Sequence, residues 1–578
     1  MAGQDVGAML DASWRRRTSP PAVLPALLLL CAVLTALAWW LPNRPRAGEV
    51  PMTADRFNSV SFAPFRPGQS PLRHRYPSAA EVEQDLALLA PRVRAVRTYA
   101  SLEGDYDVPA LAARHGLKVW QGAWLGPDAA RNEREIARLI ESANRYPDTV
   151  ERVVVGNEVL LRRDLPVEHL AAALDRVRAA VRQPVTYADV WEFWAQFPQL
   201  ADHVDIVTIH ILPYWEDEPH GVERAIAHAR EVVRRMRRMF PGKPIAIGEV
   251  GWPSRGRWRA DAAPSRVNQA VFLREFIRLA HEEGFDYNLI EAFDQVWKYK
   301  LEGTVGAAWG LFTADRQPKF PPDGPVVENP DWPLHAALAL LLSLALWAGT
   351  LRAFPRMDRA GRARLAVLAF ALGNALVFAA AGTLPDALDE HLKLAAAVNL
   401  AGQALLAALL LRRAAMRLTG APIEPPRDGA QATETVRALL ATRRGWRLLR
   451  GWRGWALDDL SFVFLWTAMA LQLLLLVDPR YRDFPLASFA VPLVAVVARA
   501  LLRDLPRGGG GREELWAGGA LALAALGSAV REGPANLQAM GWTACALILA
   551  APALLRCLAC RRHRLASAEE SRAAGNGG

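Results

Sequence analysis

Cysteine is rare in this chain and is missing from its long polar region. Only four cysteines occur among 578 residues, and they are Cys31, Cys545, Cys557 and Cys560. Disulfide bonds therefore do not stabilise residues 43–330, which are numerous enough to bury a core without them. The Cys557-Leu-Ala-Cys560 spacing occurs in redox and metal sites, but it ends an apolar run with no second pair nearby, so we interpret both residues as ordinary thiols.

Long apolar runs are absent from residues 43–330 and dominate the rest of the chain. Each run is about as long as the ~20 residues that cross a bilayer. We predict eight spans, near residues 22–41, 333–351, 363–384, 392–411, 460–477, 484–502, 513–530 and 536–556. The expected organisation is a cytoplasmic N-terminus with an anchor helix (1–42), a polar domain (43–330), a seven-span membrane domain (331–564) and a disordered cytoplasmic tail (565–578).

Basic residues are distributed unevenly around these runs. Arg15, Arg16 and Arg17 precede the first run, which predicts a cytoplasmic N-terminus and places residues 43–330 across the membrane. The loop at 385–391 has acidic residues and no Lys or Arg, and the other short outer loops hold only Arg480, Arg482 and Arg531. Every loop agrees with one orientation, so both termini are expected in the cytoplasm.

The first apolar run has two interpretations. Ala36-Leu-Ala38 at its end is compatible with a cleaved signal peptide. The run is long, however, and Trp39-Trp40 is typical of an interfacial anchor. We therefore favour an anchor that stays attached to the protein.

The formal net charge of +10 does not indicate nucleic-acid binding, because much of the excess lies beside the predicted spans and no basic groove with interleaved aromatic residues is found. The histidines of the polar domain show no paired metal-ligand spacing; they are His74, His115, His169, His203, His210, His220, His228 and His281. We expect no nucleic-acid partner, no metal and no cofactor.

The polar domain alternates strand and helix patterns from residue 58 onward. Eight strands are expected, at 58–65, 93–99, 116–124, 151–158, 184–191, 203–211, 243–250 and 286–293. The intervening helices have clear end signals, such as the capping box Ser78-Ala-Ala-Glu81 and Gly116 after a helix end. This pattern predicts an α/β fold, a closed (β/α)₈ TIM barrel, joined to an α-helical polytopic membrane domain.

In such a barrel, the residues just past the carboxyl ends of the strands line one pocket. Here they are aromatic, acidic, amide and basic side chains, a mixture typical of sugar binding. The substrate-binding candidates are Arg97, Tyr99, Asn157, Asp189, His210, Tyr214, Trp252, Glu291 and Lys298. Several have an alternative role that the sequence leaves open: core packing for His210, strand bridging for Arg97 and helix capping for Asp189.

Two glutamates, Glu158 and Glu249, end the fourth and seventh strand patterns and are the catalytic candidates. A retaining glycosidase needs a protonated carboxylic acid and a carboxylate nucleophile ~5–5.5 Å apart. Arg97 is expected to keep Glu249 ionised and Tyr214 to donate a hydrogen bond to it, so that Glu158, facing that charge, stays protonated. Asn157 is placed to bind the sugar 2-hydroxyl.

The segments around these residues resemble glycoside hydrolase family 17, the β-1,3-glucanase family of the large Asn-Glu retaining clan. The resemblance covers residues 58–320 and rests on motifs that are weak singly and fairly specific in this order. They are Val96-Arg97-Thr-Tyr99, Gly156-Asn157-Glu158, His210-Ile-Leu-Pro213-Tyr214-Trp215, Gly248-Glu249-Val-Gly-Trp252-Pro253-Ser254-Arg-Gly256, Glu291-Ala-Phe-Asp294-Gln-Val-Trp297-Lys298 and Gly306-Ala-Ala-Trp309-Gly310.

The resemblance implies that Glu158 is the acid/base and Glu249 the nucleophile, with Glu291 and Lys298 as supporting polar groups. Secreted family members generally lack seven C-terminal spans, so the architecture resembles the bacterial membrane-bound subgroup associated with synthesis or remodelling of periplasmic β-glucans, some of whose members are called β-1,6-glucan synthases. That resemblance implies a bacterial inner-membrane protein with its catalytic domain in the periplasm. The covalent intermediate of the family reacts with water or with a sugar hydroxyl, so hydrolysis and transglycosylation are both open.

Other functions are less consistent with the residues. A nucleotide-sugar synthase needs a diphosphate and metal site, and we find neither an Asp-x-Asp pair beside a strand nor a Gln-x-x-Arg-Trp segment. A non-catalytic glycan-binding or export subunit would not need both glutamates. A transporter is disfavoured because the polar residues in the spans are few, with Asn374, Asn399, Gln403 and Arg499 as the exceptions. The membrane domain is expected to be a scaffold, either docking to a membrane glucan synthase or forming an export path.

Overall fold

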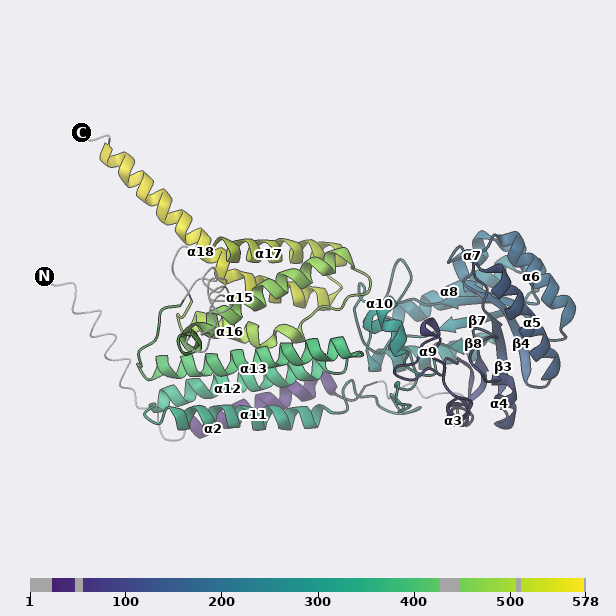
Figure 1. Ribbon diagram of the computed structural model, residues 1–578, viewed down its shortest axis with the longest axis horizontal. Coiled ribbons are helices and arrows are strands. Elements are labelled where there is room, and N and C mark those ends of the chain that lie inside the picture. Colours follow the sequence, from purple (N-terminus) through teal and green to yellow (C-terminus); the bar gives the residue numbers. More distant parts are fainter. Residues whose placement is uncertain (1–22, 47–55, 427–447, 506–510, 576–578) are drawn as a thin grey trace. The chain divides into compact units, whose positions relative to one another are not determined.

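The computed structural model describes residues 23–46, 56–426, 448–505 and 511–575 (Figure 1). The chain forms two compact units. The barrel unit consists of Pro45–Glu328 together with the short segment Arg480–Asp483, and the helical unit contains the rest of the chain. Arg15, Arg16 and Arg17, on which the predicted orientation depends, lie outside the described residues.

Eight parallel strands close into a barrel in sequence order, with β1 paired to both β2 and β8. The strands are β1 (Phe57–Ser61), β2 (Val93–Arg97), β3 (Lys118–Ala123), β4 (Val150–Asn157), β5 (Val185–Val190), β6 (Ile206–Ile211), β7 (Ile245–Val250) and β8 (Asp286–Leu289). Each expected strand is therefore present, although several are shorter than their apolar patterns. This confirms the predicted (β/α)₈ barrel.

Helices cover the outside of the barrel (Figure 1). They are α3 (Ala79–Leu89), α4 (Val108–Arg114), α5 (Ala129–Arg145), α6 (Val167–Ala180), α7 (Trp191–Gln196), α8 (Val222–Met239), α9 (Arg266–Glu283) and α10 (Tyr299–Gly306). The local end signals act as expected: Ser78 and Glu81 form a complete capping box before α3. Gly116 has a φ of +66°, a conformation open to glycine that lets the chain turn from α4 into β3.

The barrel unit has two apolar layers. Ala95, Trp120, Val154 and Ala188 pack together as a small cluster of fully buried residues from neighbouring strands β2 to β5. A much larger cluster packs strand residues such as Val153 and Ile209 against helix residues such as Leu139. The two clusters fix the strands, and so fix the positions of the side chains that follow their carboxyl ends.

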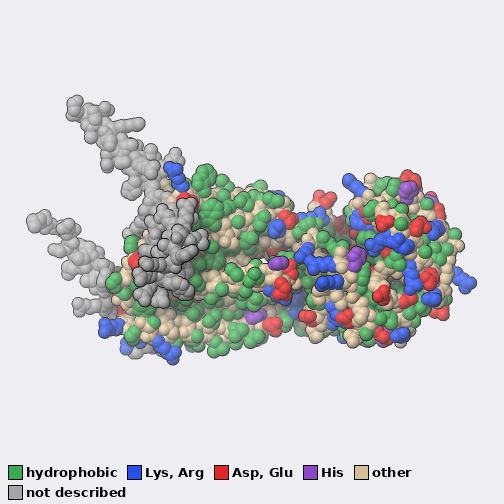
Figure 2. All heavy atoms as spheres, viewed as in Figure 1, with side chains coloured by type: hydrophobic (Ala, Val, Ile, Leu, Met, Phe, Trp, Pro, Cys, Tyr) green, Lys and Arg blue, Asp and Glu red, His purple; other side chains and the backbone are tan. Residues whose placement is uncertain are grey.

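The helical unit contains long apolar helices. Its helices are α2 (Val23–Trp40), α11 (Trp332–Ala353), α12 (Arg359–Thr383), α13 (Glu390–Leu418), α15 (Leu448–Val477), α16 (Ala490–Leu501), α17 (Arg512–Glu532) and α18 (Leu537–Gly575). Apolar side chains cover much of the face of this unit seen in Figure 2, whereas charged side chains are spread over the barrel unit. An apolar surface of this extent on a helix bundle is typical of contact with lipid.

The expectation of eight spans is corrected by the structure. Within the described residues, six helices are long and apolar enough to cross a membrane. The expected span at 484–502 forms only a short apolar helix, Ala487–Leu501, which is well below the ~20 residues that a bilayer requires. The expected span at 513–530 forms α17, whose charged ends, including Glu514 and Arg531, and whose internal glycines reduce its apolar character.

The tail is also different from the prediction. The backbone of α18 continues to Gly575, so residues 565–575 are helical where a disordered tail was expected. Their composition is rich in alanine and glutamate, which favours a helix once the preceding apolar helix has nucleated it.

Charged side chains within the helical unit are buried as matched pairs. Arg499 of α16 pairs with Asp458 of α15, and Arg413 of α13 pairs with Asp504. All four are less than a tenth exposed. Each buried charge therefore has an opposite charge beside it, as a low-dielectric environment requires.

Candidate active site

The end of β4 is irregular and carries two of the expected site residues. Gly156 has a φ of +84° and Glu158 a φ of +52°, and the pairing with β5 shifts register between Val154 and Asn157. In a regular strand, consecutive side chains point to opposite faces. The irregularity instead allows Asn157 and Glu158 to reach the same region, a use of strand distortion that is common beside active sites.

Glu249 lies near the end of β7 and is held by side chains at the end of β2 and just after it. Arg97 Nη1 donates to Glu249 Oε1 at 3.1 Å and to the carbonyl of Gly248 at 2.7 Å. Tyr99 Oη donates to Glu249 Oε1 at 2.9 Å and lies 2.8 Å from Ser61 Oγ. Arg97 is the last residue of β2 and Tyr99 lies in the segment just after it, and both side chains donate to the same oxygen of Glu249.

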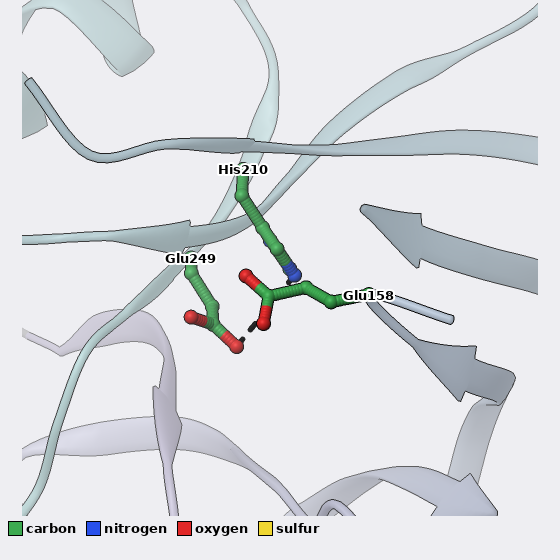
Figure 3. Close-up of side chains that lie close together, drawn as sticks. All are labelled: Glu158, His210 and Glu249. Atoms are coloured by element: carbon green, nitrogen blue, oxygen red, sulfur yellow. Dashed lines mark ion pairs between the residues drawn. The ribbon is translucent and has the colours of Figure 1, made fainter. Parts of the chain in front are cut away.

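The two glutamates point toward each other from the ends of β4 and β7, beside His210 of β6 (Figure 3). One carboxylate oxygen from each glutamate and one ring nitrogen of His210 all lie within 4.8 Å of one another. His210 Nε2 is 3.6 Å from Glu249 Oε1, the ion-pair distance drawn in Figure 3. The residues expected to converge at the carboxyl ends of β4 and β7 therefore do so.

The environments of the two carboxyl groups drive their pKa values apart. Burial raises the pKa of Glu158 to about 8, and the negative charges of Glu249 and Asp189 add to this effect. Burial also opposes ionisation of Glu249, but His210, Arg97 and the Tyr99 hydrogen bond outweigh it and hold the Glu249 pKa below its usual value. At neutral pH one carboxyl group is protonated and the other is ionised.

His210 acts as a neutral ring in this arrangement. Burial lowers the pKa of His210 to about 4, so the lasting positive charge beside Glu249 at neutral pH is that of Arg97. His210 Nε2 lies 3.1 Å from Asn157 Oδ1, which also accepts a hydrogen bond from Arg97 Nη2. Because the side-chain carbonyl oxygen of Asn157 has two hydrogen-bond partners, the orientation of its amide is fixed. The NH₂ group of Asn157 is then directed away from Arg97 and His210.

Glu158, His210 and Glu249 also have the donor types of a metal site, which the spacing of histidines in the sequence did not indicate. The charge around them disfavours a divalent ion. Arg97 donates a hydrogen bond to Glu249 Oε1, the oxygen that lies 3.6 Å from His210. A metal cation bound there would therefore be repelled by the permanent charge of the guanidinium. The set of residues fits acid–base chemistry better than metal binding.

Glu291 and Lys298 form a buried pair in the loop after β8. Lys298 Nζ donates to both carboxylate oxygens of Glu291, at 2.9 and 3.0 Å. Burial raises the pKa of Glu291 to about 7, although Lys298 opposes that rise, while the pKa of Lys298 is also raised. The charge of Lys298 also favours the ionised form of Glu249.

Three expected substrate contacts have other partners in the structure. The Tyr214 hydroxyl donates to the carbonyl of Arg257 at 2.6 Å, so the expected hydrogen bond from Tyr214 to Glu249 is wrong and Tyr99 makes it instead. Trp252 is fully buried in the apolar core, and its indole N–H donates to the carbonyl of Ala263. Bulky aromatic side chains after a strand can either bind substrate or pack in the core, and the sequence pattern alone does not distinguish these two roles.

Asp189 is also fully buried, and it supports the segment that follows Glu158. It accepts hydrogen bonds from the Tyr187 hydroxyl and from the backbone N–H groups of Leu161 and Val190. Asp189 therefore acts on the chain around Glu158 and, through its charge, on the Glu158 pKa.

Sequence reasoning missed Arg162, four residues after Glu158. Its guanidinium donates to the carbonyls of Asn157 and Leu125, pairs with Asp164 and stacks over Trp124 at 4.2 Å. Its charge opposes the rise in the Glu158 pKa. The position of Arg162, one helical turn after the candidate Glu158, could have suggested a role near the site. Only the fold shows that its guanidinium reaches back to the end of β4.

Comparison with known proteins identifies the kind of domain that carries this geometry. Residues 59–310 match a family model described as the BtgE/BtgC glycoside hydrolase domain. This region is a glycoside hydrolase domain. The match begins in β1 and ends after the loop that follows β8, so it contains every catalytic and substrate-binding candidate and none of the apolar helices. The protein is therefore a glycosidase enzyme with additional helices.

Curated relatives agree with this identification. A glucan 1,3-beta-glucosidase from Schizosaccharomyces pombe is 29% identical over 253 residues, covering 41% of this chain and 78% of that protein. A glucan 1,3-beta-glucosidase from Arthroderma benhamiae is 28% identical over 273 residues, covering 44% and 87%. The glucan endo-1,3-beta-glucosidase btgC from Emericella nidulans is 26% identical over 296 residues, covering 44% of this chain and 43% of that protein.

Among solved structures, a glycoside hydrolase family 17 β-1,3-glucanosyltransferase from Rhizomucor miehei is 23% identical, with a TM-score of 0.41. The alignment covers 46% of this chain and 98% of that one.

Proposed function

We propose that this protein is a membrane-tethered retaining glycosidase or transglycosylase that acts on β-1,3-linked glucans, with Glu158 as acid/base and Glu249 as nucleophile. The observation that carries the proposal is the pair of carboxyl groups within 4.8 Å whose pKa values are driven in opposite directions. The substrate class is suggested by the glucosidases and endo-glucosidases to which the domain is similar.

In the first step, the ionised Glu249 carboxylate attacks the anomeric carbon while the bond from that carbon to the leaving oxygen breaks. Glu158 gives its proton to the leaving oxygen, so that the released sugar carries a neutral hydroxyl. The two groups are closer together than the ~6.5–9.5 Å that an inverting enzyme leaves between its carboxyl groups for a water, which favours double displacement.

In the second step, Glu158 is a carboxylate and removes a proton from the incoming hydroxyl, which attacks the anomeric carbon and releases Glu249. If the hydroxyl belongs to water, the result is hydrolysis; if it belongs to another glucan, the result is a longer or branched chain. The Asn157 NH₂ group is proposed to bind the sugar 2-hydroxyl, since its carbonyl oxygen is already held by Arg97 and His210.

The surroundings of Glu249 favour catalysis through charge. Arg97 and Tyr99 stabilise the carboxylate before attack and after it is released. Glu291 and Lys298 are proposed to bind sugar hydroxyls beside it. Tyr214, Trp252 and Asp189 are given supporting roles, in place of substrate binding, because of their backbone and core contacts.

The six apolar helices suggest where the reaction takes place. We propose that they hold the enzyme in a bacterial inner membrane with the barrel unit in the periplasm and both termini in the cytoplasm, where it builds or remodels periplasmic β-glucans beside the bilayer. A membrane glucan synthase is the proposed protein partner. Neither a nucleic acid nor a cofactor is required by this chemistry.

The test is to incubate the full-length protein, purified in detergent, with laminari-oligosaccharides of defined length and to follow product lengths by mass spectrometry. Products longer than the substrate indicate transfer, and only shorter products indicate hydrolysis. Glu158→Gln and Glu249→Gln should each abolish both outcomes. Wild-type activity in either variant would remove that residue from the mechanism.

The roles of the two glutamates are separated by adding azide to alanine variants with an activated β-glucan substrate. In Glu158→Ala the glycosyl enzyme still forms, and azide attacks it to give the β-azide. In Glu249→Ala azide replaces the missing nucleophile and gives the α-azide. The reverse assignment of products would exchange the two roles.

A non-catalytic glycan-binding or export subunit is the alternative. It would bind laminari-oligosaccharides without changing them, and Glu158→Gln would leave that binding intact. The opposed pKa values of Glu158 and Glu249 argue against it, because a receptor gains nothing from one protonated and one ionised carboxyl group.

A further inference from the structure

A second cavity lies at the opposite end of the barrel from the glutamates. It has a volume of about 940 Å³ and is lined by residues at the amino-terminal ends of the strands. Asn58 is near the start of β1, Arg152 near the start of β4, and Asp286 begins β8. The catalytic candidates follow the carboxyl ends of the same strands, so this cavity is separate from the candidate active site.

The lining of the cavity is strongly basic. Five permanently charged or normally cationic side chains and a histidine face a single acidic residue, Asp286; the basic residues are Arg56, Arg94, Arg152, Arg237, Lys243 and His281. Three of these charges already face a carboxylate, because Arg94 pairs with Glu151, Arg237 pairs with Glu283, and Arg152 pairs with both Glu151 and Asp286.

Lys243 is different from those paired residues. Its Nζ donates to the carbonyl of Val204 at 2.7 Å, and among the residues that the structure describes no carboxylate forms an ion pair with it. Its positive charge is therefore not neutralised by the described part of the chain, and an anion in the cavity would gain from it.

Arg152 provides the second observation. Its side chain is only 6% exposed, its face stacks on Trp120 at 4.1 Å, and its Nη2 donates to Glu151 and Asp286. Its Nε and Nη1 are buried and have no hydrogen-bond partner. Buried guanidinium N–H groups without an acceptor are costly, so this site favours an acceptor with several oxygens.

We propose that this cavity binds a phosphate-bearing ligand through Arg152 and Lys243. A phosphate group offers several oxygens to the two open donors of Arg152, and its charge is matched by Lys243. The cavity is larger than one phosphate ion, so it has room for an ester as well as for the free ion. This site is independent of the glucan chemistry and would remain if the proposed function were wrong.

The phosphate group has two sources, a soluble phosphate compound or a phospholipid headgroup. Soluble ligands are typically monoesters or the free ion and carry two charges, whereas a headgroup is a diester with one. The two sources therefore differ in a property that a binding measurement detects with soluble probes.

The full-length protein is placed in nanodiscs of phosphatidylcholine and titrated by calorimetry with inorganic phosphate, glycerol 3-phosphate and glycerophosphoglycerol. Saturable binding of at least one probe is expected. Tighter binding of phosphate or the monoester identifies a soluble ligand, and tighter binding of the diester identifies a headgroup; both support the site. No saturable binding of any probe would overturn the proposal.

Two variants and one matched control locate the binding. Lys243→Gln should weaken it about tenfold or more, equal to about 1.4 kcal/mol. Arg152→Lys keeps the charge, removes the forked donors and should also weaken it. The control is Lys118→Gln, because Lys118, like Lys243, lies at the amino-terminal end of a strand and donates to a backbone carbonyl, that of Asp148, without lining the cavity.

Circular dichroism and size exclusion show whether each variant is folded. Because Lys243 is only partly buried, Lys243→Gln is expected to fold even if Arg152→Lys does not. Equal binding by the native protein and folded Lys243→Gln would overturn the proposal, as would an equal loss in Lys118→Gln, which would indicate non-specific attraction to a basic surface.

Discussion

The barrel unit and the helical unit both bury matched charge pairs, such as Lys298 with Glu291 in the barrel unit, but the candidate active site also brings two carboxyl groups together. In the helical unit each buried charge faces one of opposite sign, as Arg499 faces Asp458 and Arg413 faces Asp504. In the barrel unit Glu158 faces a second carboxyl group, Glu249, and no arginine neutralises it fully.

The difference shows what each arrangement is suited to. In a matched pair, each charge is neutralised by its partner, and the pair holds one segment of the helical unit against another. Two carboxyl groups that share a cleft compete for one proton, and the side with Arg97 and Tyr99 gives it up. Unmatched charge in the candidate active site should therefore affect turnover, whereas matched charge in the helical unit should affect stability.

The largest effect is expected for Glu249→Gln, which removes the proposed nucleophile and its negative charge from beside Glu158. Turnover of laminari-oligosaccharides should fall by about 10⁴-fold, while the thermal midpoint of the barrel unit stays the same or rises. Steady-state kinetics and calorimetry measure the two. The exposed substitution Glu133→Gln on α5 is the control and should leave turnover unchanged.

Breaking a matched pair should affect stability and not catalysis. Arg499→Gln removes the guanidinium that pairs with the buried Asp458, and we expect a loss of about 3–5 kcal/mol in unfolding free energy. Thermal unfolding of the full-length protein in detergent measures this. Arg503→Gln, at an exposed position nearby, should cost far less. A marked loss of glucan turnover well below the unfolding temperature would contradict the separation of roles.

The hydrogen bond from Tyr99 to Glu249 should be worth about 1.5–3 kcal/mol, because its acceptor is charged. Tyr99→Phe removes a group that holds the Glu249 pKa down, so the acid limb of kcat/KM should move to higher pH. Tyr214→Phe is the matched control, since that hydroxyl donates to a backbone carbonyl. A larger pH shift in Tyr214→Phe than in Tyr99→Phe would indicate that Tyr214 donates to Glu249, as expected from the sequence.

The basic limb of the profile reports Glu158, which must be protonated to act as the acid. Its pKa is raised to about 8, so activity should be present below that pH and lost above it. Asp189→Asn removes a negative charge that raises this pKa, and the basic limb should therefore move to lower pH. Asp175→Asn, at an exposed position, should not move it. An unchanged limb in Asp189→Asn would remove Asp189 from the control of this proton.

The smallest effect is expected for an uncharged contact of the helical unit. Asn374 of α12 accepts from the Trp39 indole and donates to the Thr35 hydroxyl, joining α12 to α2. Asn374→Leu should cost about 0.6 kcal/mol, the usual size of such contacts between apolar helices. The thermal midpoint in detergent measures this. A cost as large as that of Arg499→Gln would show that neutral contacts, not charge pairs, hold this unit together.

Much of the barrel was predictable from local pattern. The apolar runs before Asn157 and Glu249 identified β4 and β7, and Ser78 and Gly116 marked helix ends, because strand burial and end capping depend on neighbouring residues. The meeting of Glu158 with Glu249 followed from the rule that parallel strand ends share one edge.

The partners across the barrel could not be predicted in the same way. Tyr214 and Tyr99 both follow strands, and only the closed barrel shows that Tyr99 reaches Glu249 while Tyr214 turns to Arg257. The expectation of eight spans failed for a related reason, since apolar content does not show that the segment at 484–502 forms only a short helix. Arg152 was not noticed at all, because its neighbours in the sequence say nothing about the cavity that it lines.

The left-handed backbone of Glu158 has a consequence for the evolution of the enzyme. A side chain in that conformation costs about 1–3 kcal/mol, which the surrounding contacts must supply. Glycine adopts the same φ freely, so Glu158→Gly should give an inactive protein that melts at a higher temperature than the native one. Selection for stability alone would thus favour glycine at this position, and selection for turnover would oppose it.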